Sequence, residues 1–256
     1  MPRFSANLTF LFTELPFLER FGAAKTAGFD AVEYVCLFDH APEDLGAPLK
    51  AHGLKQVLLN VPHGNWAAGE RGIAILPDRV DEFRASLDTT IAYCRALDCQ
   101  QVNCLAGIIP PGVPHALLRE TFVANLRFAA SALKAAGIRL LIEPINSRDI
   151  PGFYLIRTAQ AFDVIKSVGS DNLLIQHDLY HMQIMEGDLA RRLAKYLPHI
   201  GHIQIADTPG RNEPGTGEIN YAFLLAEIDR LGYAGHVGCE YKPKTTTAES
   251  FRWMAR

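Results

Sequence analysis

The chain has 256 residues, of which 48% are hydrophobic and 21% are charged, and its formal net charge is −3. This composition supplies a sizeable apolar core and excludes a disordered chain. The slight negative charge gives no general attraction to nucleic acid or to an anionic membrane, so neither is expected as a partner. The chain has no run of 18 apolar residues, so we expect no membrane-spanning helix.

Short aliphatic segments typical of buried strands recur along the whole chain. We expect eight strands, at residues 3–8, 31–35, 56–60, 101–105, 139–143, 173–178, 202–206 and 236–240. Between them lie segments with helical periodicity, several with proline at the start or glycine just past the end. These predicted helices are residues 16–27, 42–52, 79–97, 114–136, 158–168, 188–197 and 221–231.

This alternation predicts a single-domain (β/α)8 TIM barrel over residues 1–256, since such a barrel takes about 250 residues. The predicted loops after helices are short, whereas several loops after strands are long and rich in glycine, proline and polar residues. The long ones are residues 61–78, 106–113, 144–157 and 207–218. Long loops on one rim indicate the face that carries function.

Four of the predicted strands carry, at or near their ends, a side chain that can bind a cation: Glu143, Asp178, Gln204 and Glu240. They are separated by 35, 26 and 36 residues, and one strand–helix unit needs about 30 residues. We therefore expect them at the same rim of the barrel. An alternative is that each residue is hydrogen-bonded separately, but four in phase with the repeat favour a common site.

Carboxylate and amide oxygens select Mg²⁺ or Mn²⁺ over thiophilic metals. Three carboxylates at one mouth would otherwise repel one another and take up protons. The sequence therefore predicts one divalent metal ion as the cofactor.

Several sequence strings resemble hydroxypyruvate isomerases of the xylose-isomerase-like TIM barrel superfamily. They are HIQIAD at 202–207, PGR at 209–211, EPGTGEINY at 213–221, GCEYKP at 238–243, LIEPIN at 141–146, FSANLT at 4–9 and AAGERG at 67–72. The resemblance covers nearly the whole chain. The string NVPHGNW at 60–66 departs from the family pattern, which has a small residue or proline in place of His63 and aspartate in place of Asn65. This departure bears on substrate preference.

The resemblance implies that Glu143, Asp178, Gln204 and Glu240 hold the divalent ion, and that Glu143 and Glu240 form the acid–base pair. The implied reaction converts hydroxypyruvate to 2-hydroxy-3-oxopropanoate (tartronate semialdehyde) through an enediolate. Moving a proton between adjacent carbons needs one group to remove it, one to return it and an electrophile for the developing oxyanion, so the residues suit this chemistry.

Four further residues are candidates for binding the small anionic hydroxy-keto acid. His181 lies three residues beyond Asp178, and we expect it on the loop above the metal. The resemblance to sugar-epimerase relatives implies that it polarises a substrate oxygen, and the alternative is a local hydrogen bond. Arg211 could pair with the substrate carboxylate, with Lys242 and Arg148 as rivals. Glu33 closes the second strand and either touches the substrate hydroxyl or orients a basic residue. His202 points the same way as Gln204 but deeper, which favours a core position.

The nearest alternatives are a 2-oxo-tetronate isomerase and a ketose 3-epimerase of the same superfamily. An endonuclease-IV-like nuclease would need a histidine-rich trinuclear zinc site and a basic groove, and a non-catalytic binding module would lack proton exchange. The five cysteines, an odd number without C-x-x-C spacing, indicate reduced thiols in a cytoplasmic protein; they are Cys36, Cys94, Cys99, Cys104 and Cys239. A homo-oligomer is left open.

Overall fold

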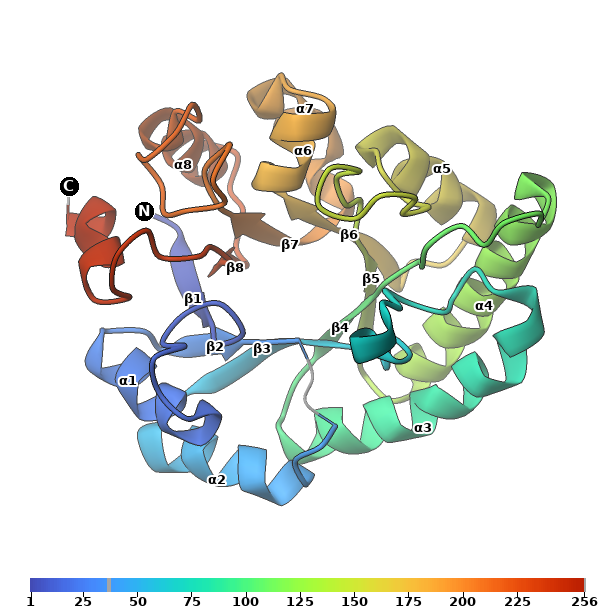
Figure 1. Cartoon of the computed structure of the whole chain (residues 1–256), viewed down its shortest axis with the longest axis horizontal. Helices are drawn as coiled ribbons and strands as arrows, with labels where there is room; N and C mark the ends of the chain where they lie inside the picture. The colour runs from blue at the N-terminus through green and yellow to red at the C-terminus, as the bar shows by residue number, and fades with distance from the viewer. Residues whose placement is uncertain (36–37, 256) are drawn as a thin grey trace.

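Eight parallel strands form a closed barrel in the computed structural model, which describes residues 1–35 and 38–255. The strands follow one another around the ring in chain order, and β1 pairs with β8 to close it (Figure 1). Their bounds are β1 Arg3–Asn7, β2 Ala31–Glu33, β3 Lys55–Asn60, β4 Gln101–Cys104, β5 Arg139–Ile142, β6 Leu173–Asp178, β7 Ile200–Ile205 and β8 His236–Cys239. The predicted (β/α)8 fold is confirmed.

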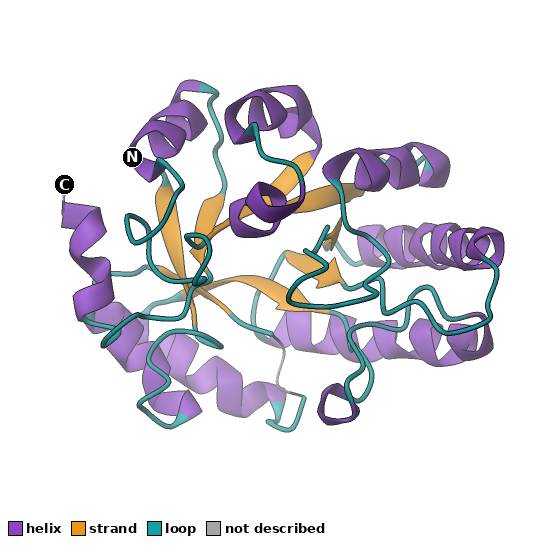
Figure 2. Ribbon diagram, turned by 45° about the horizontal axis from the view of Figure 1, so that its top comes forward, coloured by secondary structure: helices purple, strands orange, loops and turns teal. Residues whose placement is uncertain are grey.

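The helices surround the barrel, as Figures 1 and 2 show. Their bounds are α1 Arg20–Thr26, α2 Pro42–His52, α3 Val80–Ala96, α4 His115–Ala135, α5 Thr158–Val168, α6 Leu179–Met185, α7 Leu189–Tyr196 and α8 Tyr221–Arg230. Single turns of 3₁₀ helix occur at Phe17–Glu19, Trp66–Ala68, Pro77–Arg79 and Leu197–His199, and a longer one lies at Glu249–Ala255. Every helix in the described chain is too short or too polar to cross a membrane.

The helices begin and end at residue types that favour helix termini. Helix α2 begins at Pro42, whose fixed φ suits a first turn, and ends before Gly53, which adopts φ of 59°. Helices α2 and α5 have the predicted bounds, whereas the predicted first helix divides into a 3₁₀ turn and α1. Most strands are within a residue or two of their predicted bounds, and β5 and β8 each end one residue before the glutamate.

Helix α6 is the main correction. The segment after Asp178 was expected to be a loop, but it is a helix, so His181 lies on α6. The cause is local: the Asp178 side chain accepts a hydrogen bond from the backbone N–H of Tyr180 at 2.8 Å and so caps the new helix. The chain therefore turns from strand into helix without any glycine or proline to mark the boundary.

The barrel interior is partly polar. Ser5, Asn7, Glu33, His202 and Gln204 all point into it and are buried. The apolar core lies mainly between the barrel and the helices, where the outward-facing side chains of the strands meet the helix stripes. The described cysteines Cys94, Cys99, Cys104 and Cys239 are free thiols and buried, and Cys36 lies outside the described residues.

The long loops after the strands meet across one end of the barrel (Figure 2). Ile108 in the loop after β4 forms an isolated bridge with Phe153 in the loop after β5. Ile75 in the loop after β3 donates its N–H to the carbonyl of Ala106 at 3.1 Å. Because these loops support one another, the C-terminal rim has fixed walls around its central cavity.

Candidate active site

A cavity of about 500 Å³ opens at the C-terminal rim of the barrel. The predicted site residues that line it are Glu143, His181, Gln204, Arg211, Glu240 and Lys242. Asp178 is fully buried beside Glu143 and His181, and Glu33 is fully buried among the barrel's interior side chains, outside the cavity lining. Arg148 is exposed and does not line the cavity.

Glu143, Asp178 and His181 form a compact set of buried ligand groups. One potential ligand atom from each lies within 4.8 Å of the others. His181 Nε2 lies 3.5 Å from Asp178 Oδ2 and 3.9 Å from Glu143 Oε1. Asn146 Nδ2 lies 2.7 Å from His181 Nδ1, which fixes the ring with Nε2 toward the carboxylates.

Burial and mutual repulsion control the protonation of these acids. Burial, reinforced by the charge of Asp178, raises the pKa of Glu143 to about 8. Burial raises the pKa of Asp178 to about 6, against the opposing effect of Arg211. The pKa of Glu240 is also raised by burial and by its acidic neighbours. The pKa of His181 is lowered by burial, which leaves its ring neutral at pH 7.

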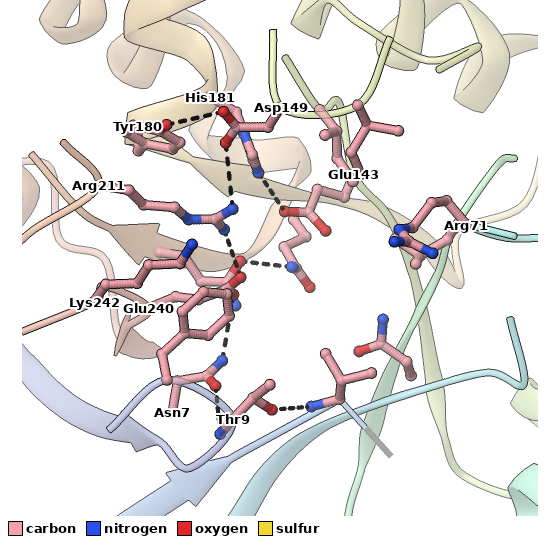
Figure 3. A pocket seen from close by; sticks show the side chains of 18 of the residues that line it. Asn7, Thr9, Arg71, Glu143, Asp149, Tyr180, His181, Arg211, Glu240 and Lys242 are labelled. Atoms are coloured by element: carbon pink, nitrogen blue, oxygen red, sulfur yellow. Dashed lines mark hydrogen bonds and ion pairs between the residues drawn. The ribbon is translucent and has the colours of Figure 1, made fainter. Parts of the chain in front are cut away.

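Arg211 is the cation that faces this acidic cluster. Its Nη2 lies 2.7 Å from Glu240 Oε1 and 3.7 Å from Asp178 Oδ2, and its Nη1 lies 3.5 Å from Asp149 Oδ2. Its guanidinium also lies over the rings of Phe10 and Tyr180, at 4.8 and 5.0 Å from their centroids. Figure 3 shows Arg211 between Asp149 and Glu240. The structure therefore pairs Arg211 with the protein's own carboxylates.

The donor set fits a divalent cation. Asp178 Oδ2 is buried and has no hydrogen-bond partner among the described residues, although its other oxygen caps α6. Two carboxylates and one neutral imidazole face one another here, and a divalent charge would offset the burial and the acidic neighbours that raise the pKa values of Glu143 and Asp178. His181 offers a nitrogen that the predicted oxygen-only set did not include.

Glu33 organises the layer beneath the cavity. Its carboxylate accepts hydrogen bonds from Ser5 Oγ at 2.7 Å and Gln204 Nε2 at 2.8 Å, and lies 2.8 Å from His202 Nε2. Its contact with His202 confirms the core position expected for that histidine. Asn7 links the layers, because its Nδ2 lies 3.2 Å from Glu33 Oε1 and 3.3 Å from Glu240 Oε2.

Several residues that line the cavity were not singled out from the sequence. Arg71 and Trp66 come from the loop after β3, and Asp149 from the loop after β5. The string at 67–72 was recognised only as a family match, and it contains Arg71. A lone arginine between Glu70 and Gly72 in a long rim loop was the available signal.

Comparison with known proteins places this architecture in a family. The family model for the xylose isomerase-like TIM barrel matches residues 21–256. The chain is 51% identical to hydroxypyruvate isomerase of Escherichia coli (strain K12), over 99% of this chain and 98% of that protein. It is 46% identical to 2-oxo-tetronate isomerase of Cupriavidus necator, with the same coverage.

One solved structure is very similar, with a TM-score of 0.97 and 44% identity, covering 100% of this chain and 98% of the other. It is described as an AP endonuclease of family 2 from Brucella melitensis. The two isomerase relatives span the full length, and the residues of the acidic rim fit proton transfer. The chain belongs to the hydroxypyruvate isomerase family of xylose isomerase-like TIM barrels and is an isomerase.

Proposed function

We propose that this isomerase interconverts hydroxypyruvate and 2-hydroxy-3-oxopropanoate. The observation that supports it most is that Glu143 and Glu240 line one cavity, both with a raised pKa. A carboxyl group whose pKa is raised holds and releases a proton closer to working pH than an ordinary carboxyl group does. The cavity volume of about 500 Å³ suits a small acid.

The two glutamates approach the substrate from different directions, because they follow β5 and β8, three positions apart in a ring of eight strands. One takes the proton from the hydroxyl-bearing carbon, and the other returns a proton to the neighbouring carbon. The hydroxyl proton passes to the former carbonyl oxygen, so that the product carries an aldehyde and a hydroxyl group. Asn103 Nδ2 donates to Glu143 Oε2 at 2.7 Å and orients that carboxylate. Asn7 and Arg211 orient the two oxygens of Glu240.

We propose that one divalent ion, Mg²⁺ or Mn²⁺, is held by Glu143, Asp178, Gln204 and Glu240, with His181 beside the first two. When bound, it supplies positive charge to the developing oxyanion, which is worth several kcal/mol. Gln204 Nε2 is bound by Glu33, so its Oε1 is directed away from that carboxylate. Gln204 Oε1 accepts from Gln176 Nε2 at 2.6 Å and keeps a second lone pair for the ion.

A four-carbon substrate, 2-oxo-tetronate, is the second candidate, supported by the relative from Cupriavidus necator. The departure at His63 and Asn65 lies in a loop that borders the cavity at Trp66. The nuclease alternative has little support: among the described residues only one group of three metal-ligating side chains meets, and the net charge is −3.

The test is an assay of hydroxypyruvate loss with and without EDTA, in water and in deuterium oxide. We expect turnover that EDTA abolishes and Mg²⁺ or Mn²⁺ restores, with deuterium from solvent in the product. Running 2-oxo-tetronate in parallel ranks the two substrates by kcat/KM. Absence of turnover with either substrate in the metal-loaded protein would contradict the proposal.

A further inference from the structure

Arg71 is a cation of the cavity wall, and no carboxylate among the described residues forms an ion pair with it. Its Nη1 donates to the carbonyl oxygens of Trp66 at 3.0 Å and Glu70 at 2.7 Å. Within the part of the chain that the structure describes, it makes no ion pair, and its Nε and Nη2 have no partner. Figure 3 shows the Arg71 guanidinium pointing into the cavity.

The surrounding loop holds this guanidinium in place. The Trp66 ring lies 3.7 Å from Arg71 Cζ, and Trp66 begins a 3₁₀ turn that Asn65 caps through a hydrogen bond to Ala68 N–H. Gly72 adopts φ of 109°, and a Cβ there would overlap the carbonyl of Leu105. Its N–H donates to the carbonyl of His63 at 2.9 Å. The loop is therefore closely fitted to the barrel on both sides of Arg71.

The neighbouring residue Glu70 also holds the loop in place. Its carboxylate accepts from the backbone N–H of Asn65 at 2.5 Å and pairs with Arg79 at the start of α3. The only acid adjacent in sequence to Arg71 is thus already engaged. An arginine held by two carbonyls and a ring loses little further entropy on binding a ligand.

Arg71 is placed where it can bind one end of a small acid in the cavity. It follows β3, whereas Arg211 follows β7, four positions away in the ring of eight, so they face each other across the cavity. Glu143 follows β5, midway between them. Arg211 is already paired with Glu240, Asp178 and Asp149, so the protein's own carboxylates balance its charge.

We propose that Arg71 binds the carboxylate of the substrate and makes the enzyme selective for keto acids over uncharged ketols. This inference rests on the proposed isomerase function and names the group that sets its substrate class. The planar guanidinium presents Nε and Nη2 as a fork that matches a carboxylate. Lys242 is the rival cation, but it is exposed, and among the described residues no hydrogen bond or ion pair orients its ammonium.

The experiment compares Arg71→Met, Arg71→Lys and Lys242→Met with the wild type. Arg191→Met is the matched control, since the Arg191 side chain is 88% exposed on α7 and does not line the cavity. We expect Arg71→Met to raise KM for hydroxypyruvate about 100-fold, with a smaller effect on kcat. Arg71→Lys keeps the charge but loses the fork, and we expect a rise of about tenfold. Thermal unfolding checks that each variant is folded.

A binding measurement separates this proposal from the isomerase function itself. Glycerate is an unreactive anion of substrate length, and glycerol is its uncharged counterpart. We expect calorimetry on the Mg²⁺-loaded protein to show affinity for glycerate about 100-fold weaker in Arg71→Met, and glycerol unaffected. This readout needs no turnover, so it decides the role of Arg71 even where hydroxypyruvate is not a substrate.

Three results would overturn the role of Arg71. One is an Arg71→Met variant whose KM and glycerate affinity match those of the wild type. Another is a Lys242→Met variant that shows the expected losses in place of Arg71→Met. The third is a wild-type protein that binds glycerate no better than glycerol.

Discussion

Gln204 donates its Nε2 hydrogen to Glu33 Oε1 at 2.8 Å, deep in the barrel. The other Glu33 oxygen lies 2.8 Å from His202 Nε2. Because an amide carries its donor and acceptor on opposite sides, fixing the nitrogen on Glu33 also fixes the direction of the oxygen. Glu33 therefore acts on the proposed metal site through Gln204, as a positioning residue.

The first prediction concerns this contact. Glu33→Gln allows the Gln204 side-chain amide to flip, so that its nitrogen and oxygen exchange places, because the new side chain presents a donor as well as an acceptor. We expect the affinity for Mn²⁺ to fall by about 10- to 100-fold, measured by calorimetry. Ser5→Ala removes another hydrogen bond to the same carboxylate without touching Gln204 and serves as the control. Unchanged Mn²⁺ affinity in a folded Glu33→Gln protein would show that Gln204 needs no such orientation.

The second prediction concerns the acid–base pair. Glu143→Gln and Glu240→Gln keep the side-chain shape but cannot exchange protons, so we expect kcat to fall about 10²- to 10⁴-fold. The measurement is turnover of hydroxypyruvate together with incorporation of solvent deuterium. Glu249→Gln, on the C-terminal 3₁₀ helix outside the cavity lining, provides a matched loss of charge. Near-normal turnover in either cavity variant would refute the assignment.

The third prediction concerns pH and metal removal. The pKa of Glu143 is about 8 in the metal-free fold and returns to its ordinary 4.5 on unfolding, so the folded state binds the proton more tightly. This contribution to stability is complete below pH 4.5 and is lost as pH rises through about 8. Asp178 acts in the same direction, because its pKa is raised to about 6.

We therefore expect the melting temperature of EDTA-treated protein to fall as pH rises across this range. Excess Mg²⁺ should flatten the profile, because the ion replaces the protons. Glu143→Gln should reduce the slope in EDTA. Scanning calorimetry at several pH values provides the measurement, and a melting temperature independent of pH in EDTA would contradict the prediction.

The fourth prediction concerns a glycine in β8. A Cβ at Gly238 would overlap both oxygens of Glu33, which four hydrogen-bonding groups hold in place. Gly238→Ala should therefore lower the free energy of unfolding by about 1–3 kcal/mol. In Gly46→Ala, on α2, the added carbon meets its neighbours at 3.6 Å or more, and it should leave stability unchanged or slightly raised. Urea denaturation of both variants tests the difference.

The strands and the acidic rim could be predicted because their signals are local and periodic. Each strand is a short aliphatic run, and Glu143, Asp178 and Glu240 stand out because charge is costly at a strand end. The closed ring then carries such residues to one rim. The ligand roles stay predictions. So do the assignments to the substrate of His181, Arg211, Lys242 and Glu33.

Side-chain directions in the loops could not be predicted. Helix α6 has only seven residues, too few for a clear period, and the residue that caps it also belongs to the acidic cluster. The assignment of Arg211 to the substrate carboxylate stays a prediction, and the three protein carboxylates that lie around it could not be foreseen from the sequence. The place of Arg71 in the cavity wall could not be predicted, because its orientation depends on backbone carbonyls and a tryptophan ring in the same loop.

The polar column inside the barrel has a consequence for protein engineering. Gln101, His202, Glu33 and Gln204 form consecutive contacts of 3.4, 2.8 and 2.8 Å along the barrel interior. Exchanging only Gln204, in order to adapt the proposed metal site to a softer metal, would remove one of the hydrogen-bond donors of the buried Glu33 carboxylate. Libraries that vary the cavity lining together with the layer of Glu33 beneath it should therefore yield more folded, active clones than libraries confined to the cavity lining.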